Sequence, residues 1–124
     1  DLTYMKMSEI QEIPAEKFVN WIAENFYKPV PSSIDTYEDA VAASKLLAFY
    51  ANGYAYLCQV HSCLKITART EKRLGHKERA EDYADKRDIA EEMSKVIKQC
   101  YQAVSRMLTV RQNNLDELNM SENR

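Results

Sequence analysis

The chain has 124 residues, which is typical of one domain, and its 45% hydrophobic and 29% charged residues exclude a disordered tail. Two glycines and three prolines provide too few tight turns for an all-β sandwich or barrel, and a net charge of −2 argues against a general polyanion binder. Three cysteines without the spacing of a secreted module predict reduced thiols in a cytoplasmic protein. The charges among residues 1–17 predict that no signal peptide is present.

The first predicted element is a short helix that begins at Pro14 and ends near Tyr27. Proline is tolerated at the first helical position, because its missing N–H would have no partner there. The helix ends before Pro29, since a residue that precedes proline avoids the helical region. This helix and its connector make up the N-terminal part, residues 1–34. Three apolar residues share one helical face: Phe18, Ile22 and Phe26.

The second predicted element is a long helix within residues 35–75. Thr36 has the pattern of an N-cap, since acidic residues follow it in the first turn, and Gly75 is suited to the C-terminal cap. Gly53 lies inside the helix, where it marks either a kink or a close helix crossing. The apolar seam of this helix alternates spacings of four and three: Leu46, Tyr50, Gly53, Leu57, Val60 and Leu64.

The third predicted element is a long helix within residues 76–120, and no glycine or proline interrupts it. With a turn at Gly75, the two long helices are expected to form an antiparallel hairpin. We therefore expect an all-α fold, a short N-terminal helix on a long helical hairpin, in a single domain over residues 1–124. The seam of the third helix consists of Tyr83, Ala90, Met93, Ile97, Cys100, Val104, Met107, Leu108 and Leu115.

The stretch from Leu46 to Leu64 carries no charge and is apolar around most of the helix. Its length approaches that of a membrane span, but its polar residues and its richness in alanine and tyrosine favour burial in protein, so we expect no membrane association. A hairpin and one short helix offer little cover for such a stretch, which predicts a homo-oligomeric bundle. The predicted interface consists of Leu46, Tyr50, Leu57, Val60, Leu64, Ile97 and Val104.

Charge is distributed unevenly along the chain, with net values of −5 over residues 1–44, +5 over residues 45–111 and −2 over residues 112–124. The positive excess is concentrated around the predicted turn. There it forms a basic patch, which Lys86 and Arg87 would widen. The candidate nucleic-acid-binding residues of this patch are Lys65, Arg69, Lys72, Arg73, Lys77 and Arg79.

This basic patch has two interpretations. It is either a surface that contacts nucleic-acid phosphates or a solvated helix end, where cations are favoured by the helix dipole. The neighbouring acids, Glu81, Asp82 and Asp85, would neutralise part of the patch. Aromatic residues upstream, such as Phe49 and Tyr56, are suited to base stacking, whereas Tyr50 and Tyr54 are expected in the core.

No catalytic or cofactor motif occurs in the sequence. Two separated glycines cannot form a glycine-rich phosphate loop, and no ExxH or HExxH pair is present. Cys58 and His61 share a helical face, but a zinc site needs two more ligands. No acid can be assigned to orient a histidine against a cysteine nucleophile. We therefore expect no enzymatic activity, no metal site and no cofactor.

The segment Ala51–Met120 has a long helix ending in spaced lysines and arginines, then a second long helix with the stretches Asp88–Met93 and Cys100–Arg106 and a polar region at 112–114. In outline it resembles the UvsY recombination mediators of T-even phages. That family is helical and oligomeric and loads a recombinase on single-stranded DNA covered by single-strand-binding protein. The resemblance covers a little over half of the chain, and residues 1–44 have no counterpart in it. It implies phosphate contacts at Lys65, Arg69, Lys72 and Arg73, with Arg106 and Arg111 as weaker candidates.

The sequence thus predicts a non-enzymatic accessory protein that binds single-stranded nucleic acid through the basic hairpin end, as a recombination mediator does. The alternative is a protein–protein interaction module, such as a small phage-encoded inhibitor or adaptor, which the acidic ends and the uncharged middle of the second helix fit equally well. The expected partners are a second copy of the chain, single-stranded DNA and a protein, in an intracellular setting such as the host cell of a phage.

Overall fold

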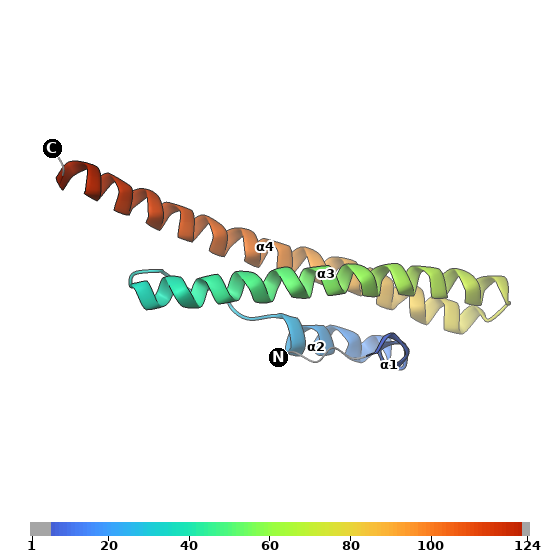
Figure 1. The fold of residues 1–124 in the computed structure, drawn as a ribbon. Coiled ribbons are helices and arrows are strands. Elements are labelled where there is room, and N and C mark those ends of the chain that lie inside the picture. Colours follow the sequence, from blue (N-terminus) through green and yellow to red (C-terminus); the bar gives the residue numbers. More distant parts are fainter. Residues whose placement is uncertain (1–5, 123–124) are drawn as a thin grey trace.

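The computed structural model describes residues 6–122 and contains four helices and no strand over that range. They are α1 (Met7–Gln11), α2 (Ala15–Phe26), α3 (Tyr37–Arg73) and α4 (Lys77–Glu122). Figure 1 shows α3 and α4 side by side as a long antiparallel pair, with α1 and α2 along one side of it. The expected all-α hairpin is therefore confirmed. No helix within 6–122 combines the length and the apolarity that a membrane crossing requires.

The helix α3 begins where the sequence predicts. The Thr36 hydroxyl oxygen accepts a hydrogen bond from the Asp39 N–H at 3.1 Å, and the Asp39 carboxylate accepts from the N–H groups of Asp35 at 3.0 Å and Thr36 at 3.1 Å. Thr36 and Asp39 thus form a capping box. The bonds from the backbone of Asp35 and Thr36 hold the pKa of the Asp39 carboxyl below its usual value.

The helix α3 also ends at the predicted glycine. Gly75 has a φ of +81°, a left-handed conformation that glycine adopts without steric cost. Its N–H donates to the Lys72 carbonyl at 3.1 Å, and the His76 N–H donates to the Glu71 carbonyl at 2.9 Å. This pair of bonds is a Schellman motif, which satisfies the last carbonyls of the helix and turns the chain into α4.

The helix α2 packs its predicted apolar face against the hairpin, and Phe18, Ile22 and Phe26 are all buried. Pro14 precedes this helix as its N-cap rather than occupying the first helical position, and the short helix α1 before it was not predicted. A Cβ at Gly53 would lie 3.2 Å from Cδ1 of Phe26. Gly53 therefore marks a close helix crossing, one of the two predicted alternatives.

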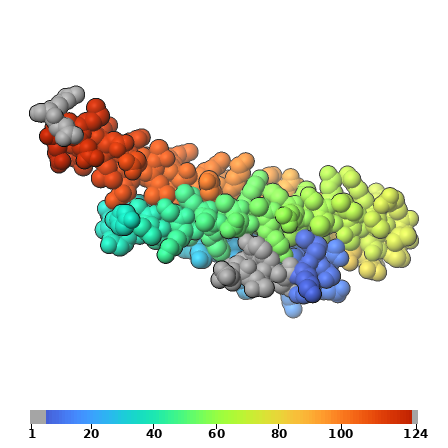
Figure 2. Space-filling model, in the orientation of Figure 1, coloured from blue at the N-terminus to red at the C-terminus, as the bar shows by residue number. Residues whose placement is uncertain are grey.

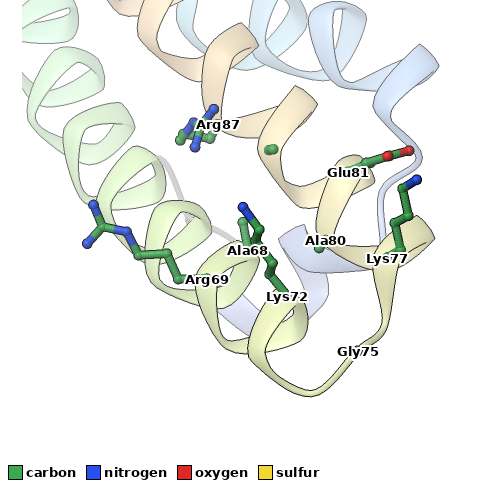
Figure 3. Close-up of a pocket in the computed structure, with 9 residues that line it drawn as sticks. Ala68, Arg69, Lys72, Gly75, Lys77, Ala80, Glu81 and Arg87 are labelled. Carbon is green, nitrogen blue, oxygen red and sulfur yellow. The ribbon is translucent and has the colours of Figure 1, made fainter.

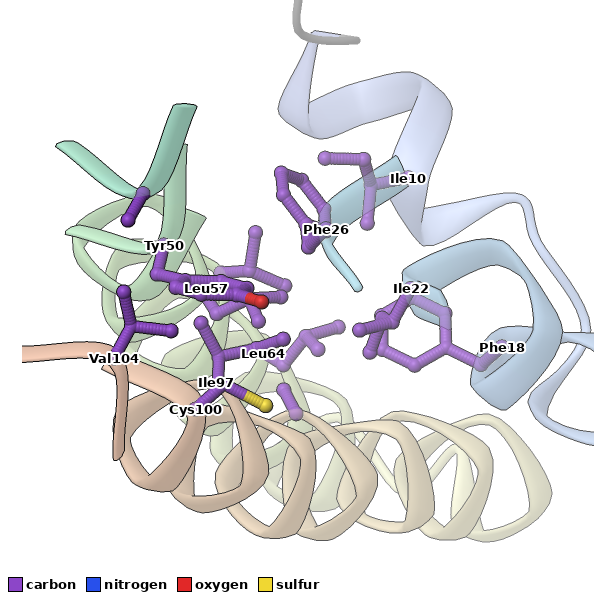
Figure 4. Packing of buried hydrophobic residues seen from close by; sticks show 13 residues of the cluster. Ile10, Phe18, Ile22, Phe26, Tyr50, Leu57, Leu64, Ile97, Cys100 and Val104 are labelled. Carbon is purple, nitrogen blue, oxygen red and sulfur yellow. The ribbon is translucent and has the colours of Figure 1, made fainter. Parts of the chain in front are cut away.

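One hydrophobic cluster fills the space between the hairpin and the N-terminal helices (Figure 4). The ring of Tyr50 is fully buried in this cluster, and its hydroxyl donates to the Lys28 carbonyl at 2.6 Å, so the buried phenol keeps a partner. Burial raises the pKa of the Tyr50 phenol and of the Cys100 thiol. The core thus joins the connector, α3 and α4 in one unit.

The residues predicted to form an oligomer interface belong to this core. Leu46 is half-buried, and the other six residues are 0% exposed within the single chain. The predicted location of the interface is therefore wrong. The reason is that the seams of α3 and α4 bury each other, with α2 packed alongside. The outward side of α3 carries only small or uncharged polar residues: Ala48, Ala51, Asn52, Ala55, Cys58, Gln59 and Ser62. Assembly as such stays a prediction.

Candidate nucleic-acid interface

An open groove of about 700 Å³ lies between the last turns of α3 and the first turns of α4 (Figure 3). We call it the basic groove. Four cations and one anion line it, together with small residues that leave room for a ligand. Its lining consists of Arg69, Lys72, Lys77, Arg87, Glu81, Ala68, Ala80, Ala84 and Gly75.

The shape of the basic groove follows from the helix ends that form it. Ala68 and Ala80 are buried where the two helices meet, so no large side chain fills the space above them. The Schellman turn at Gly75 closes the groove at its tip, and nothing lies within 4 Å of the place where a Gly75 Cβ would be. Figure 3 shows Lys72 and Arg87 reaching toward the space between the helices from opposite sides.

Five of the six sequence-predicted basic residues divide into three groups. Arg69, Lys72 and Lys77 line the basic groove. Arg73 lies beside it, in a second hollow of about 460 Å³ that also contains Arg69, Lys72 and Ile66. Lys65 is exposed one turn further up α3, outside both hollows.

Arg79 is separated from these residues by its partners. Its guanidinium lies 3.5 Å from the Glu71 carboxylate, which also pairs with His76. A hydrogen bond with the Tyr83 side chain and the charge of Glu71 raise the pKa of Arg79. Because Glu71 pairs with this cation and Arg79 lies outside the lining of the basic groove, Arg79 contributes less to the positive charge of the groove than the cations that line it do. Its prediction as a binding residue therefore loses support.

The remaining cations of α3 and Lys77 are exposed and unpaired within the described residues, which suits anion binding. Lys65, Arg69, Lys72 and Lys77 are exposed, and none of them takes part in an ion pair with another residue of the described range 6–122. Most of the acids expected to neutralise the patch lie elsewhere. Asp82 pairs with Lys86 instead, and Glu81 is the one acid that lines the basic groove among the described residues.

Lys86 and Arg87 have opposite surroundings, although the sequence predicts the same role for both. Arg87 lines the basic groove, and its Nε donates to the exposed Asp88 carboxylate at 3.0 Å. Lys86 is 1% exposed, and its ammonium donates to the carbonyls of Gln11 at 2.6 Å and Ile13 at 3.0 Å, with the Asp82 carboxylate at 2.9 Å. The prediction that Lys86 widens the patch is therefore wrong, because its charge fixes the end of α1 to α4.

The aromatic residues proposed for base stacking lie away from the groove. Phe49, Tyr54 and Tyr56 are half-buried against the core, and Tyr50 is inside it. Tyr56 precedes Ala68 by twelve residues, which is about 18 Å along a helix. Within the described part of the chain no aromatic side chain lines the groove. The described lining therefore offers cations but no aromatic ring on which a base could stack.

The sequence prediction missed the alanines that form the floor of the groove, and it placed Arg87 in the patch without their spacing. Ala80, Ala84 and Arg87 follow spacings of four and three, so they share one face of α4. That spacing would have identified the α4 side of the groove. Over residues 6–122, no group of three or more His, Cys, Asp or Glu side chains could hold a metal ion.

Comparisons of the chain with models of protein families, with curated proteins and with solved structures give no match. The resemblance to the UvsY-type mediators therefore stays a prediction, and the basic groove is the feature of the molecule that bears on its function.

Proposed function

We propose that the protein is a non-enzymatic accessory factor that binds the phosphate backbone of single-stranded nucleic acid in the basic groove. The observation that carries this proposal is the placement of Lys72 of α3 and Arg87 of α4 on either side of a floor of small residues, with the Gly75 turn at one end. Cations on both helices can contact one strand at the same time. A solvated helix end would not need cations contributed by the neighbouring helix.

The chemistry of the groove predicts binding with little base preference. Lysine and arginine neutralise phosphates and release counterions, so affinity falls as salt rises. Four phosphate contacts give a slope of log K against log salt of about −3 for a single strand. Because aromatic side chains are absent from the lining over residues 6–122, stacking adds nothing to affinity there.

The proposal is tested by fluorescence anisotropy of a labelled single-stranded oligonucleotide across a salt series. The groove variant carries four charge reversals, Arg69→Glu, Lys72→Glu, Lys77→Glu and Arg87→Glu. We expect it to lose binding while its helicity by circular dichroism stays that of the wild type. Unchanged binding by this folded variant would overturn the proposal.

A matched control separates the groove from net charge. It carries the same number of reversals at exposed lysines that form no ion pair within residues 6–122 and lie outside the basic groove: Lys6, Lys17, Lys45 and Lys98. Both variants have the same net charge. We expect the control to bind with the wild-type salt slope, because it keeps every phosphate contact. Equal loss in both variants would mean that only overall charge matters.

A second candidate function is a protein–protein interaction module. It is favoured by the opposite end of the hairpin, where Leu118 and Met120 are 59% and 62% exposed. If the wild type binds no oligonucleotide even at low salt, the cations of the groove are a solvated helix end and this second candidate leads. In either case we propose that the protein acts as a homo-oligomeric scaffold.

A further inference from the structure

The helix α4 is longer than its partner in the hairpin. Residues 112–122, which we call the α4 tail, run on past the first turn of α3 and rise away from it (Figure 1). Figure 2 shows the tail as a projection beyond the body of the molecule. Six of the twelve exposed large hydrophobic side chains within residues 6–122 lie at this open end: Tyr37, Val41, Val110, Leu115, Leu118 and Met120.

The apolar seam of α4 continues into this unpaired region. Exposure along the seam rises from 0% at Val104 to 37% at Leu115 and 59% at Leu118. The periodicity that packs α4 against α3 is thus maintained where α3 is no longer present. A helix that keeps an apolar seam outside its own hairpin requires another surface to bury it.

The open end also contains a hollow that a helix could occupy. It has a volume of about 510 Å³ and lies between the 33–35 segment and α4. Its apolar lining comes from Ile34, Met107, Val110 and Leu115, and its charged lining consists of two cations, Arg106 and Arg111, and one acid, Asp35. An occupant therefore needs apolar side chains flanked by acids.

The α4 tail itself has that composition. Its Leu115 and Leu118 are flanked by three acids, Asp116, Glu117 and Glu122, and it contains no cation among its described residues. The basic and acidic segments of one helix are thus complementary in charge. A surface that is complementary to itself fits a two-fold pair of identical chains.

The spacing of the seam allows the same pairing. Residues Leu108, Arg111, Leu115 and Leu118 are separated by three, four and three positions, so the pattern reads the same in both directions about residue 113. In an antiparallel pair centred there, Leu108 lies opposite Leu118 of the second copy. Arg111 then lies beside Asp116 of the second copy, which gives an attractive contact on both sides of the axis.

We propose that two copies of the chain associate through antiparallel pairing of their α4 tails at the open end. The pairing buries the exposed seam and joins Arg106 and Arg111 of each copy to the acids of the other. This interface is distinct from the basic groove and does not depend on the proposed function. Since each tail is short, the interface between the two copies is small. The association is therefore weak, with a dissociation constant in the micromolar range.

The test is sedimentation velocity of the full chain across the micromolar range, without nucleic acid. A positive-tail variant carries Asp116→Lys and Glu117→Lys, and a negative-tail variant carries Arg106→Glu and Arg111→Glu. We expect the wild type to form dimers, each variant alone to be monomeric because like charges meet, and their equimolar mixture to form a heterodimer. The mixture is decisive, because no effect on folding alone restores association between two different chains.

Two outcomes would overturn the proposal. One is a wild type that stays monomeric throughout the range. The other is a variant that dimerises alone as well as the wild type does, which would locate the interface elsewhere. Circular dichroism of each variant checks the fold, and Leu118→Ser, a change of one exposed side chain, provides an independent variant that should also weaken the dimer.

Discussion

At the Gly75 end of the hairpin, hydrogen bonds satisfy the helix terminus and leave cations free for solvent, whereas at the opposite end the α4 tail extends without a partner helix. The first end uses small residues and a left-handed glycine, so its shape is set within the chain. The second end keeps an apolar seam exposed. The difference separates two kinds of surface, a groove lined by cations and small residues and an apolar seam that is open to solvent.

The largest effect is expected from Lys86, which holds α1 beside the Gly75 end. In Lys86→Ala, the carbonyls of Gln11 and Ile13 lose their donor and Asp82 loses its cation. Hydrogen bonds to charged groups contribute roughly 1.5–3 kcal/mol each, so we expect a loss of about 3 kcal/mol in the free energy of unfolding. Urea denaturation followed by circular dichroism measures it.

The adjacent residue is the control for this prediction. Arg87→Ala removes only an ion pair with the exposed Asp88, so it should change stability by less than about 0.5 kcal/mol, yet weaken oligonucleotide binding. If both substitutions destabilise the protein equally, the contrast between the two residues is wrong.

A smaller loss is expected from Gly75→Ala. An alanine in the left-handed conformation costs roughly 1–2 kcal/mol, and no neighbouring atom offers a compensating contact. The melting temperature should fall, and oligonucleotide affinity should fall with it because Gly75 lines the groove. Leu74→Ala, a change of the exposed residue before it, should leave both unchanged. An unaltered melting temperature for Gly75→Ala would contradict this prediction, because it would show that the turn accepts an alanine without strain.

The smallest effect is expected at the open end. Thr36→Ala removes one bond of the capping box and should cost about 1 kcal/mol, seen as faster hydrogen exchange in the first turn of α3.

Because the pKa of Asp39 is lowered in the folded state, the contribution of its carboxylate to stability is present above the unfolded pKa and is lost as pH falls through the folded pKa. Acidification should therefore loosen α3 near Thr36. In Asp39→Asn that pH dependence should be absent.

Local chemistry made most of the helix bounds predictable. Thr36 with Asp39, Pro29 and Gly75 each act within a few residues of the boundary they define. What failed depends on contacts between distant residues. α1 has five residues, and the Lys86 ammonium that caps it is more than 70 positions away in the chain.

The sequence predicted the part of the candidate site on α3 better than the part that depends on how α4 packs. The cations of α3 are evident from charge alone, but Lys86 and Arg87 are adjacent and alike in sequence. Only the side on which α1 packs makes one a buried structural cation and the other a groove residue. The same cause led to the wrong interface, since periodicity identifies a buried seam without showing whether other helices of the same chain or a second chain cover it.

The 46 residues of α4 form one uninterrupted helix, about 69 Å long at 1.5 Å per residue. The basic groove and the tail therefore occur on the same stiff rod, and neither can change its direction without the other. In a tail-to-tail pair the two grooves would point outward, on the order of 100 Å apart by the same rise per residue. Such a pair would act as a spacer that holds two strand segments at a fixed separation, rather than as a clamp on one.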